Sequence, residues 1–346
     1  MRSSRHGFIG YLIGLAVLLI GISGWPSAIG ADGGTPRTTA APRRFAVARA
    51  LGWLHAQQRD DGSFGGVLTT TADVVYAAAL AGEDPDGPSW TPGPRSLLDA
   101  LRELSQTQAT NAGRVGKALR ALGVAGYTTA DPTVAALVAK LDTFYDPATG
   151  LYSPTQGFYH ALAVEGLARV GASVPSKAID ALLVRQKADG GWGWAFGQPE
   201  SASDVDTTGQ VMRALRAAGI SPNHPAMVKA VAFLAARQRA DGGWAWGEAA
   251  GSSDGNATAL ALAGLIAADV DPLAPPFADR EPTALGFILD LQQPSGAFAY
   301  LPDRPEDNLM ATLDIIPALS PAWPGDHALP IRGFLPNVYM GTLSWE

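Results

Sequence analysis

A motif that recurs about every fifty residues limits how this chain can fold more than any other feature of the sequence. Each copy consists of an apolar stretch that ends in Gln, followed by a turn of the form Gly-x-aromatic. The copies pair Gln58 with Phe64, Gln186 with Trp192, Gln238 with Trp244 and Gln292 with Phe298, and a reduced copy lies at residues 150–152. Such a period is typical of folds in which each unit buries its apolar face only by stacking on its neighbours. One repeat domain is therefore expected, although 346 residues would by length alone suggest two domains.

Each repeat reads as two helices. In the first helix, apolar residues recur at helical spacing, as at Ile179, Leu182 and Leu183, and the glycine turn ends it. The second helix is rich in Ala, and its small side chains should let helices approach closely. The pattern predicts six helix pairs, over about residues 44–82, 94–123, 131–171, 176–219, 226–268 and 282–319. The second pair lacks the Gly-x-aromatic turn.

A helix with an aromatic–Leu pair, then Gln, then Gly-x-Trp resembles the QW repeat of the squalene cyclase and prenyltransferase superfamily. The matching residues are Phe233, Leu234, Gln238, Gly242 and Trp244; Leu182, Gln186, Gly190 and Trp192; and Trp53, Leu54, Gln58, Gly62 and Phe64. The resemblance covers residues 44–319. It implies an all-α fold, an α6/α6 toroid of six inner and six outer helices, with the apolar mouth of the barrel as the usual ligand site. It also implies that each glutamine amide bonds to a neighbouring helix end while the aromatic ring packs beside it.

The N-terminus has the layout of an export signal. Arg2 and Arg5 precede an apolar run over residues 8–25, and small residues then lead to Ala31, a plausible cleavage position. The run is also just long enough for an uncleaved membrane anchor. We therefore expect residues 1–31 to be a signal peptide or anchor, 32–43 a linker, 44–320 the toroid and 321–346 an extended tail. The toroid is expected to work outside the cytoplasm, with membrane contact only through the N-terminal segment.

The sequence Asp-Val-Asp-Thr-Thr at residues 204–208 resembles the Asp-x-Asp-Asp acid motif of class II terpene cyclases. The resemblance implies that Asp206 would protonate an isoprenoid double bond, with Asp204 beside it, but Thr207 replaces the last aspartate. Helix capping is the alternative interpretation, because Asp, Asn and Thr are ordinary residues at helix starts. The next repeat has Asp254 and Asn256 in the same places without an acid motif, which favours capping.

Aromatic residues beside the turns are candidates for a ligand-binding surface at one end of the barrel. The candidates are Trp194, Phe196, Trp246, Tyr300 and Tyr159, with His160 at the start of an inner helix. Their alternative role is to cover the loops between helix pairs. Acidic residues in the corresponding loops, Glu200 and Asp307, could take part in polysaccharide cleavage, but the sequence does not identify an acid pair with the spacing that this reaction needs.

Composition removes several classes of function. With no Cys and scattered histidines, a thiolate zinc site, a cysteine nucleophile and a thioester are all excluded, and no metal or cofactor is expected. A net charge of −7 gives no basic face for nucleic acid.

Three functions remain open. A single barrel is expected to admit water to a carbocation, so the favoured hypothesis is binding of an apolar small molecule, isoprenoid-like or vitamin-like, or of a partner, without catalysis. The alternatives are a class II cyclase or isomerase that uses Asp206, and a structural module of the cell surface.

Overall fold

The computed structural model describes residues 39–198, 201–248 and 250–324, all within one compact unit, Arg37–Glu346. In these residues the chain forms twelve α-helices, one short 3-10 helix (η1, Pro88–Trp90) and no strand. The helices are α1 (Ala40–His55), α2 (Leu68–Leu80), α3 (Leu97–Gln108), α4 (Ala112–Val124), α5 (Pro132–Asp142), α6 (Gly157–Arg169), α7 (Ser176–Leu183), α8 (Val205–Ala217), α9 (Pro225–Arg237), α10 (Gly255–Ala267), α11 (Ala284–Asp290) and α12 (Leu309–Leu319). All six predicted pairs are present, including the second.

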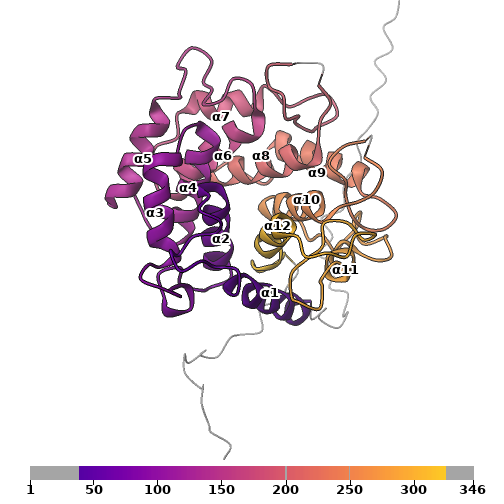
Figure 1. Cartoon of the computed structure of the whole chain (residues 1–346). Coiled ribbons are helices and arrows are strands. Elements are labelled where there is room, and N and C mark those ends of the chain that lie inside the picture. Colours follow the sequence, from indigo (N-terminus) through magenta and orange to yellow (C-terminus); the bar gives the residue numbers. More distant parts are fainter. Residues whose placement is uncertain (1–38, 199–200, 249, 325–346) are drawn as a thin grey trace, which may run out of the picture. The chain divides into compact units, whose positions relative to one another are not determined.

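The even-numbered helices form a closed inner ring. Each packs against the next in chain order, and α12 packs against α2 to close the ring. The odd-numbered helices lie outside, and the first of them, α1, packs on the last inner helix, α12 (Figure 1). The predicted α6/α6 toroid is thus confirmed.

Small residues set the close spacing of the inner helices. A Cβ atom on Gly209 would lie 2.2 Å from the carbonyl oxygen of Leu260, and one on Gly116 would lie 2.5 Å from the backbone of Leu162. Because real Cβ atoms never come so close to backbone, these glycines let α8 approach α10, and α4 approach α6, nearly backbone to backbone.

Gln58, Gln186 and Gln292 fasten neighbouring units, as the resemblance implied, whereas Gln238 donates to Gly242 O of its own turn. Gln186 Nε2 donates to the carbonyls of Gly190 (2.8 Å) and Ala226 (2.7 Å), the latter at the start of the next outer helix. Gln292 Nε2 donates to Ala46 O at 2.8 Å and thereby joins the last pair to the first. The repeat thus continues across the chain ends.

The aromatic residue of each turn is buried beside the junction between neighbouring units, which we call the seam. Trp192 and Trp244 are fully buried, and each indole N–H donates to a carbonyl near the end of its own outer helix, at 2.7 and 2.8 Å. The backbone N–H of the aromatic residue donates to a side chain of the following inner helix. The acceptors are Thr71, His160, Thr208, Thr258 and Thr312. We call these five positions the acceptor register.

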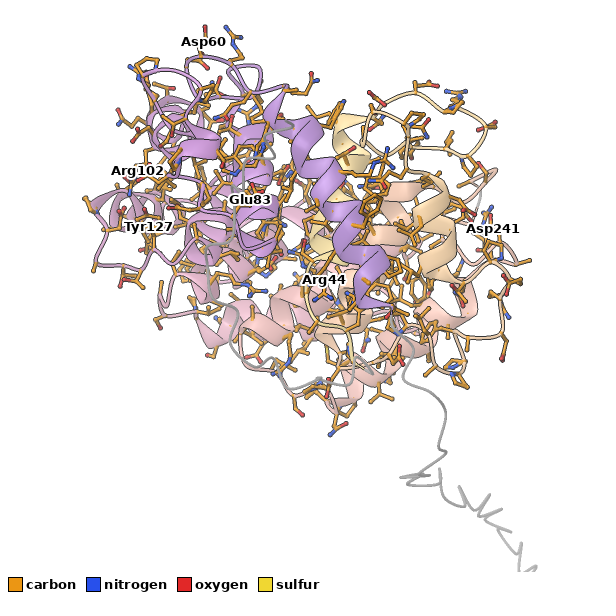
Figure 2. The ribbon with its side chains drawn as sticks, turned by 90° about the horizontal axis from the view of Figure 1, so that it is seen from below. Arg44, Asp60, Glu83, Arg102, Tyr127 and Asp241 are labelled. Carbon is orange, nitrogen blue, oxygen red and sulfur yellow. The ribbon has the colours of Figure 1, made fainter. Side chains whose placement is uncertain are left out.

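The seam between α3 and α5 has no such glutamine. Gln108 instead caps α2, through Leu68 N and Gly66 O. Arg102 takes over the connection: it pairs with Asp131 at 3.1 Å and stacks over the ring of Tyr127 at 4.8 Å (Figure 2). A groove of about 440 Å³ remains along this seam.

The chain ends differ partly from expectation. The helix α1 begins at Ala40, inside the segment expected to be a linker, and Trp323 is buried rather than part of an extended tail. The predicted signal or anchor at 1–31 and residues 325–346 of the predicted tail lie outside the described residues. In the part that the structure describes, no helix is both long and apolar enough to span a bilayer.

Candidate functional site

A cavity of about 670 Å³ opens where the N-terminal turns of all six inner helices meet, a size typical of small-molecule sites. Two tryptophans from the turns after α7 and α9 complete its wall. The lining residues are Thr69, Thr70, Asp73, Gly113, Arg114, Lys117, Phe158, Tyr159, Leu162, Trp194, Asp206, Trp246, Asn256, Leu260, Leu309, Met310, Leu313 and Asp314. We refer to it as the mouth cavity.

The two aspartates of the acid motif have different environments. Asp204 is the N-cap of α8: its carboxylate accepts from the backbone N–H of Thr207 at 2.6 Å and of Trp194 at 2.7 Å. Burial raises its pKa, against the effect of these hydrogen bonds. The capping interpretation is therefore right for Asp204, which holds the Trp194 turn against the helix.

Asp206, in the first turn of α8, caps nothing. Its Oδ1 is buried without a hydrogen-bond partner, and the side chain lines the mouth cavity. Burial, with the nearby carboxylates of Asp254, Asp204 and Asp314, raises the pKa of Asp206 well above its ordinary value of 3.8. A raised pKa favours the protonated form of a carboxyl group, which is the form that can donate a proton.

A second, partly buried carboxyl group lies across α10 from Asp206. Asp314 on α12 lines the cavity and accepts a hydrogen bond from the Asn256 amide of α10. Burial and the carboxylate of Asp73 raise the pKa of Asp314 to about 6, although Lys117, Arg120 and the Asn256 amide favour its charged form. Asp206, Asn256 and Asp314 thus form an arc over three consecutive inner helices.

The opposite wall carries paired charges. Asp73 of α2 forms ion pairs with Lys117 and, at 2.9 Å, with Arg120, both on α4. Asp73, Lys117 and the exposed Arg114 line this side of the cavity. This wall suits a polar group of a ligand better than a hydrocarbon.

A buried ion network lies deeper in the barrel. Glu165 of α6 is fully buried and accepts from Arg213 at 3.0 Å and from Gln210 at 2.8 Å. Burial alone would raise the pKa of Glu165, but Arg213, Arg120 and Arg169 outweigh it and hold the pKa at about 2. Arg213 of α8 also donates to the Tyr76 hydroxyl of α2 at 2.6 Å, so the network links opposite sides of the inner ring.

The sequence-predicted aromatic residues separate into two groups. Trp194, Trp246 and Tyr159 line the cavity, and the Trp194 ring packs against Tyr159 at 5.5 Å between centroids. Phe196 instead covers Gly157, close enough that a Cβ there would touch its ring, and Tyr300 is half-exposed beyond the lining. These two do not share the predicted surface with the others.

His160 has a structural position. It occupies the acceptor register of the third repeat, where Nδ1 accepts from Tyr152 N at 3.1 Å and Nε2 donates to Ala178 O at 3.0 Å. The residue is fully buried, and burial lowers its pKa to about 4, so the ring is neutral. Its placement among ligand-binding residues is therefore corrected, because both ring nitrogens are used within the fold.

Sequence reasoning missed much of the lining, although the repeat holds the signal. Positions two residues before the acceptor register point into the cavity: Thr69, Phe158, Asp206, Asn256 and Met310. Four of the five positions two residues after it do the same: Asp73, Leu162, Leu260 and Asp314. Applying this offset along the sequence would have singled out Asp73 and Asp314.

Two other kinds of site find little support in the geometry. Across residues 39–324, apart from 199–200 and 249, no three His, Asp or Glu side chains are arranged to hold a metal ion. Asp307 is engaged by the Trp53 indole N–H and the Ser295 hydroxyl, and Glu200 lies outside the described residues.

Comparisons with known proteins agree with this architecture. The family model of the squalene-hopene cyclase C-terminal domain matches residues 160–270, which include the acid motif and two full repeats. No curated protein sequence gives a significant match. The predicted resemblance to the squalene cyclase and prenyltransferase superfamily is confirmed, and the chain has the fold of type II terpene cyclases.

Solved structures extend the likeness over the toroid. The type II terpene cyclase MstE from Scytonema aligns at 18% identity with a TM-score of 0.57, covering 81% of this chain and 98% of that one. A variant of MstE in complex with geranylgeranyl dihydroxybenzoate, its substrate, aligns at 18% identity with a TM-score of 0.58, covering 81% and 97%. The ent-copalyl diphosphate synthase from Streptomyces platensis aligns at 20% identity and 0.52, covering 73% of this chain and 50% of that one. At sequence identities this low, the similarity to these structures shows the fold alone.

Proposed function

We propose that this protein binds a linear isoprenoid in the mouth cavity and starts its cyclisation or isomerisation by protonating a carbon–carbon double bond from Asp206. The observation that carries the proposal is the environment of Asp206: a carboxyl group with an unpartnered oxygen and a strongly raised pKa at the wall of a ligand-sized cavity. Protonation of an alkene needs such an acid, held in its neutral form.

Two objections from the sequence lose their weight. Capping is performed by Asp204, which leaves Asp206 free for chemistry. The expectation that a single barrel admits too much water for a cyclase is also weakened. Nearly the whole of MstE, a type II terpene cyclase, is covered by 81% of this chain. Four aromatic rings, Phe158, Tyr159, Trp194 and Trp246, line the cavity and offer π-faces to a developing cation.

The charged wall supports a second candidate function, binding without turnover. Thr207 replaces the last aspartate of the acid motif, and Asp73 and Lys117 place charges in the cavity that a bare hydrocarbon does not match. A ligand with a polar end suits both functions, because its polar end would face α2 and α4 while its hydrocarbon faces α8.

The two functions are separated by one set of measurements. The purified protein is incubated with farnesol, geranylgeraniol and geranylgeranyl diphosphate; binding is followed by quenching of tryptophan fluorescence and products by mass spectrometry. We expect Asp206→Asn to lower turnover about 10²–10⁴-fold, the usual contribution of a positioned acid, while binding stays within about threefold. The control is Asp290→Asn, on the exposed end of α11. If the wild type binds these compounds without converting them, the second function is favoured. If it neither binds nor converts them, both proposed functions are contradicted.

We also propose that residues 1–31 direct the protein out of the cytoplasm. The basic start, apolar run and small residues before Ala31 support this. Determining the N-terminal sequence of the protein isolated from its native host tests it, and a cytoplasmic protein that retains Met1 would refute it.

A further inference from the structure

A cyclisation started by a proton must end by losing one, so a proton acceptor is needed as well as a donor. This requirement follows from the proposed function, on which the inference rests. The alkene takes a proton from Asp206, a carbocation forms, and the new double bond appears only when a base removes a proton from a carbon next to the cation. Among the described residues of the mouth cavity, Asp73, Asp206 and Asp314 are the carboxyl groups.

Asp73 is held by other charges. It forms ion pairs with both Lys117 and Arg120, so its carboxylate oxygens are already engaged within the protein. Asp314 differs, because its hydrogen-bond donor is the neutral amide of Asn256. Moreover, Asn256 on α10 occupies the position equivalent to Asp206 on α8, and Asp314 lies on the next inner helix, α12, so a single inner helix separates the helices of the two carboxyl groups.

We propose that Asp314 is the base that ends the reaction, by accepting the proton that the cyclised cation loses. The balance closes within the cavity. Asp206 gives up its O–H proton and becomes a carboxylate; a C–H bond of the cation breaks, its electron pair becomes the new double bond, and Asp314 gains the proton. Solvent that enters after product release then returns a proton from Asp314 to Asp206, so the reaction is an isomerisation without net proton change.

The electrostatics of the arc assign the two carboxyl groups to opposite roles. Facing Asp314 are Asp73 from α2, Lys117 and Arg120 from α4, and Asp206 and Arg213 from α8. The cations moderate the effect of burial, so the pKa of Asp314 rises only to about 6 and the group is mostly ionised at neutral pH. Burial and the neighbouring carboxylates raise the pKa of Asp206 well above its ordinary value, which favours its protonated form. One group can therefore donate while the other accepts, as acid–base pairs with divergent pKa values do.

The test uses Asp314→Asn, which keeps the shape and can still accept from Asn256, with Asp314→Glu as the rescue variant. Each is assayed in deuterated water with whichever of farnesol or geranylgeranyl diphosphate the wild type converts. We expect the Asn variant to lose about 10²-fold or more of alkene formation. It should still incorporate deuterium and should yield alcohols from water capture, with binding within about threefold. The rate of the wild type should decrease as the pH is lowered below about 6. This acidic limb of the pH–rate profile should be absent in the Asn variant and restored in the Glu variant.

Several outcomes would overturn the assignment. An Asn variant that forms the same alkene at the wild-type rate, or that keeps the acidic limb, would show that another group removes the proton. If the Asn variant does not fold, a Glu variant that folds but does not retain the acidic limb would count equally against it. These results differ from failure of the proposed function, in which the wild type converts neither probe and Asp206→Asn changes nothing; that outcome removes the role of Asp314 as well.

Discussion

Asp206 shows how a single residue of a candidate functional site can lower the free energy of unfolding of the protein. Its pKa is higher in the folded chain than the ordinary value of 3.8, so the folded state binds its proton more tightly than the unfolded state does. Stability is therefore lost as pH rises above about 4 and on toward the raised pKa. We expect Asp206→Asn to melt close to the wild type at about pH 3 and a few degrees above it at about pH 7.

The measurement is thermal unfolding followed by circular dichroism across this pH range. Asp290→Asn serves as the control, because its exposed carboxyl should leave the difference flat. If Asp206→Asn were less stable than the wild type at every pH, its carboxylate would have a structural partner and the assignment of the acid would be wrong.

Single residues were the hardest features to predict from the sequence. The motif at residues 204–208 allowed both capping and acid chemistry, and the structure assigns capping to Asp204 while leaving Asp206 without a partner. Nothing local distinguishes the two, because the difference arises from what packs around each carboxyl. His160 was misplaced for the same reason: its two hydrogen-bond partners, Tyr152 and Ala178, come from either side of its helix in the chain.

Helical elements were predicted well because their signals are local. Apolar spacing, Ala-rich stretches and glycine turns placed all six pairs. The start of an inner helix was less certain, as for α8, which begins at Val205 ahead of the Ala-rich part because Asp204 caps it. The sequence also did not show why every turn needs a glycine. The first glycine of each Gly-x-aromatic turn has positive φ, and a Cβ atom on it would collide with a backbone carbonyl of the next repeat. These glycines are Gly62, Gly150, Gly190, Gly242 and Gly296.

Two glycines with nearly the same φ allow the strain of positive φ to be measured separately from the close contact with the next repeat. Gly190 (φ 90°) would place a Cβ 2.4 Å from Lys229 O, whereas Gly219 (φ 89°) has open space around that position. We expect Gly219→Ala to cost about 1–2 kcal/mol, the strain of positive φ alone. Gly190→Ala should cost at least about 2 kcal/mol more, because α9 must shift.

Urea unfolding of the two variants measures the difference. Equal losses would show that the turn glycines serve only backbone conformation, and that the contact with the next repeat gives way without cost. The comparison needs no reference to the ligand, so it tests the seam independently of the proposed function.

At the scale of the whole molecule, the sequence predicted a ring but not what closes it. The repeat implied that the last pair meets the first, and Gln292 does bond to Ala46. A second closure comes from a residue that was expected to belong to the linker. Arg43 in α1 donates to the carbonyls of Leu319 (3.0 Å) and Pro321 (2.8 Å) and stacks over Trp323 at 4.4 Å. A partner nearly the whole chain away leaves no local signal, which is why the sequence could not show this contact.

Ring closure makes Arg43 the most informative residue for the stability of the toroid. Arg43 is buried against the end of α12, whereas its neighbour Arg44 is exposed on the same helix (Figure 2). We expect Arg43→Ala to lower the free energy of unfolding by about 3 kcal/mol, since two carbonyls lose a charged donor and the Trp323 ring loses its cover. Arg44→Ala should stay within about 0.5 kcal/mol of the wild type. Because a closed ring transmits the loss to the α12–α2 contact, hydrogen exchange should rise on both α1 and α12 in Arg43→Ala. Exchange confined to the first turn of α1, with unchanged stability, would mean that the inner helices alone hold the ring closed.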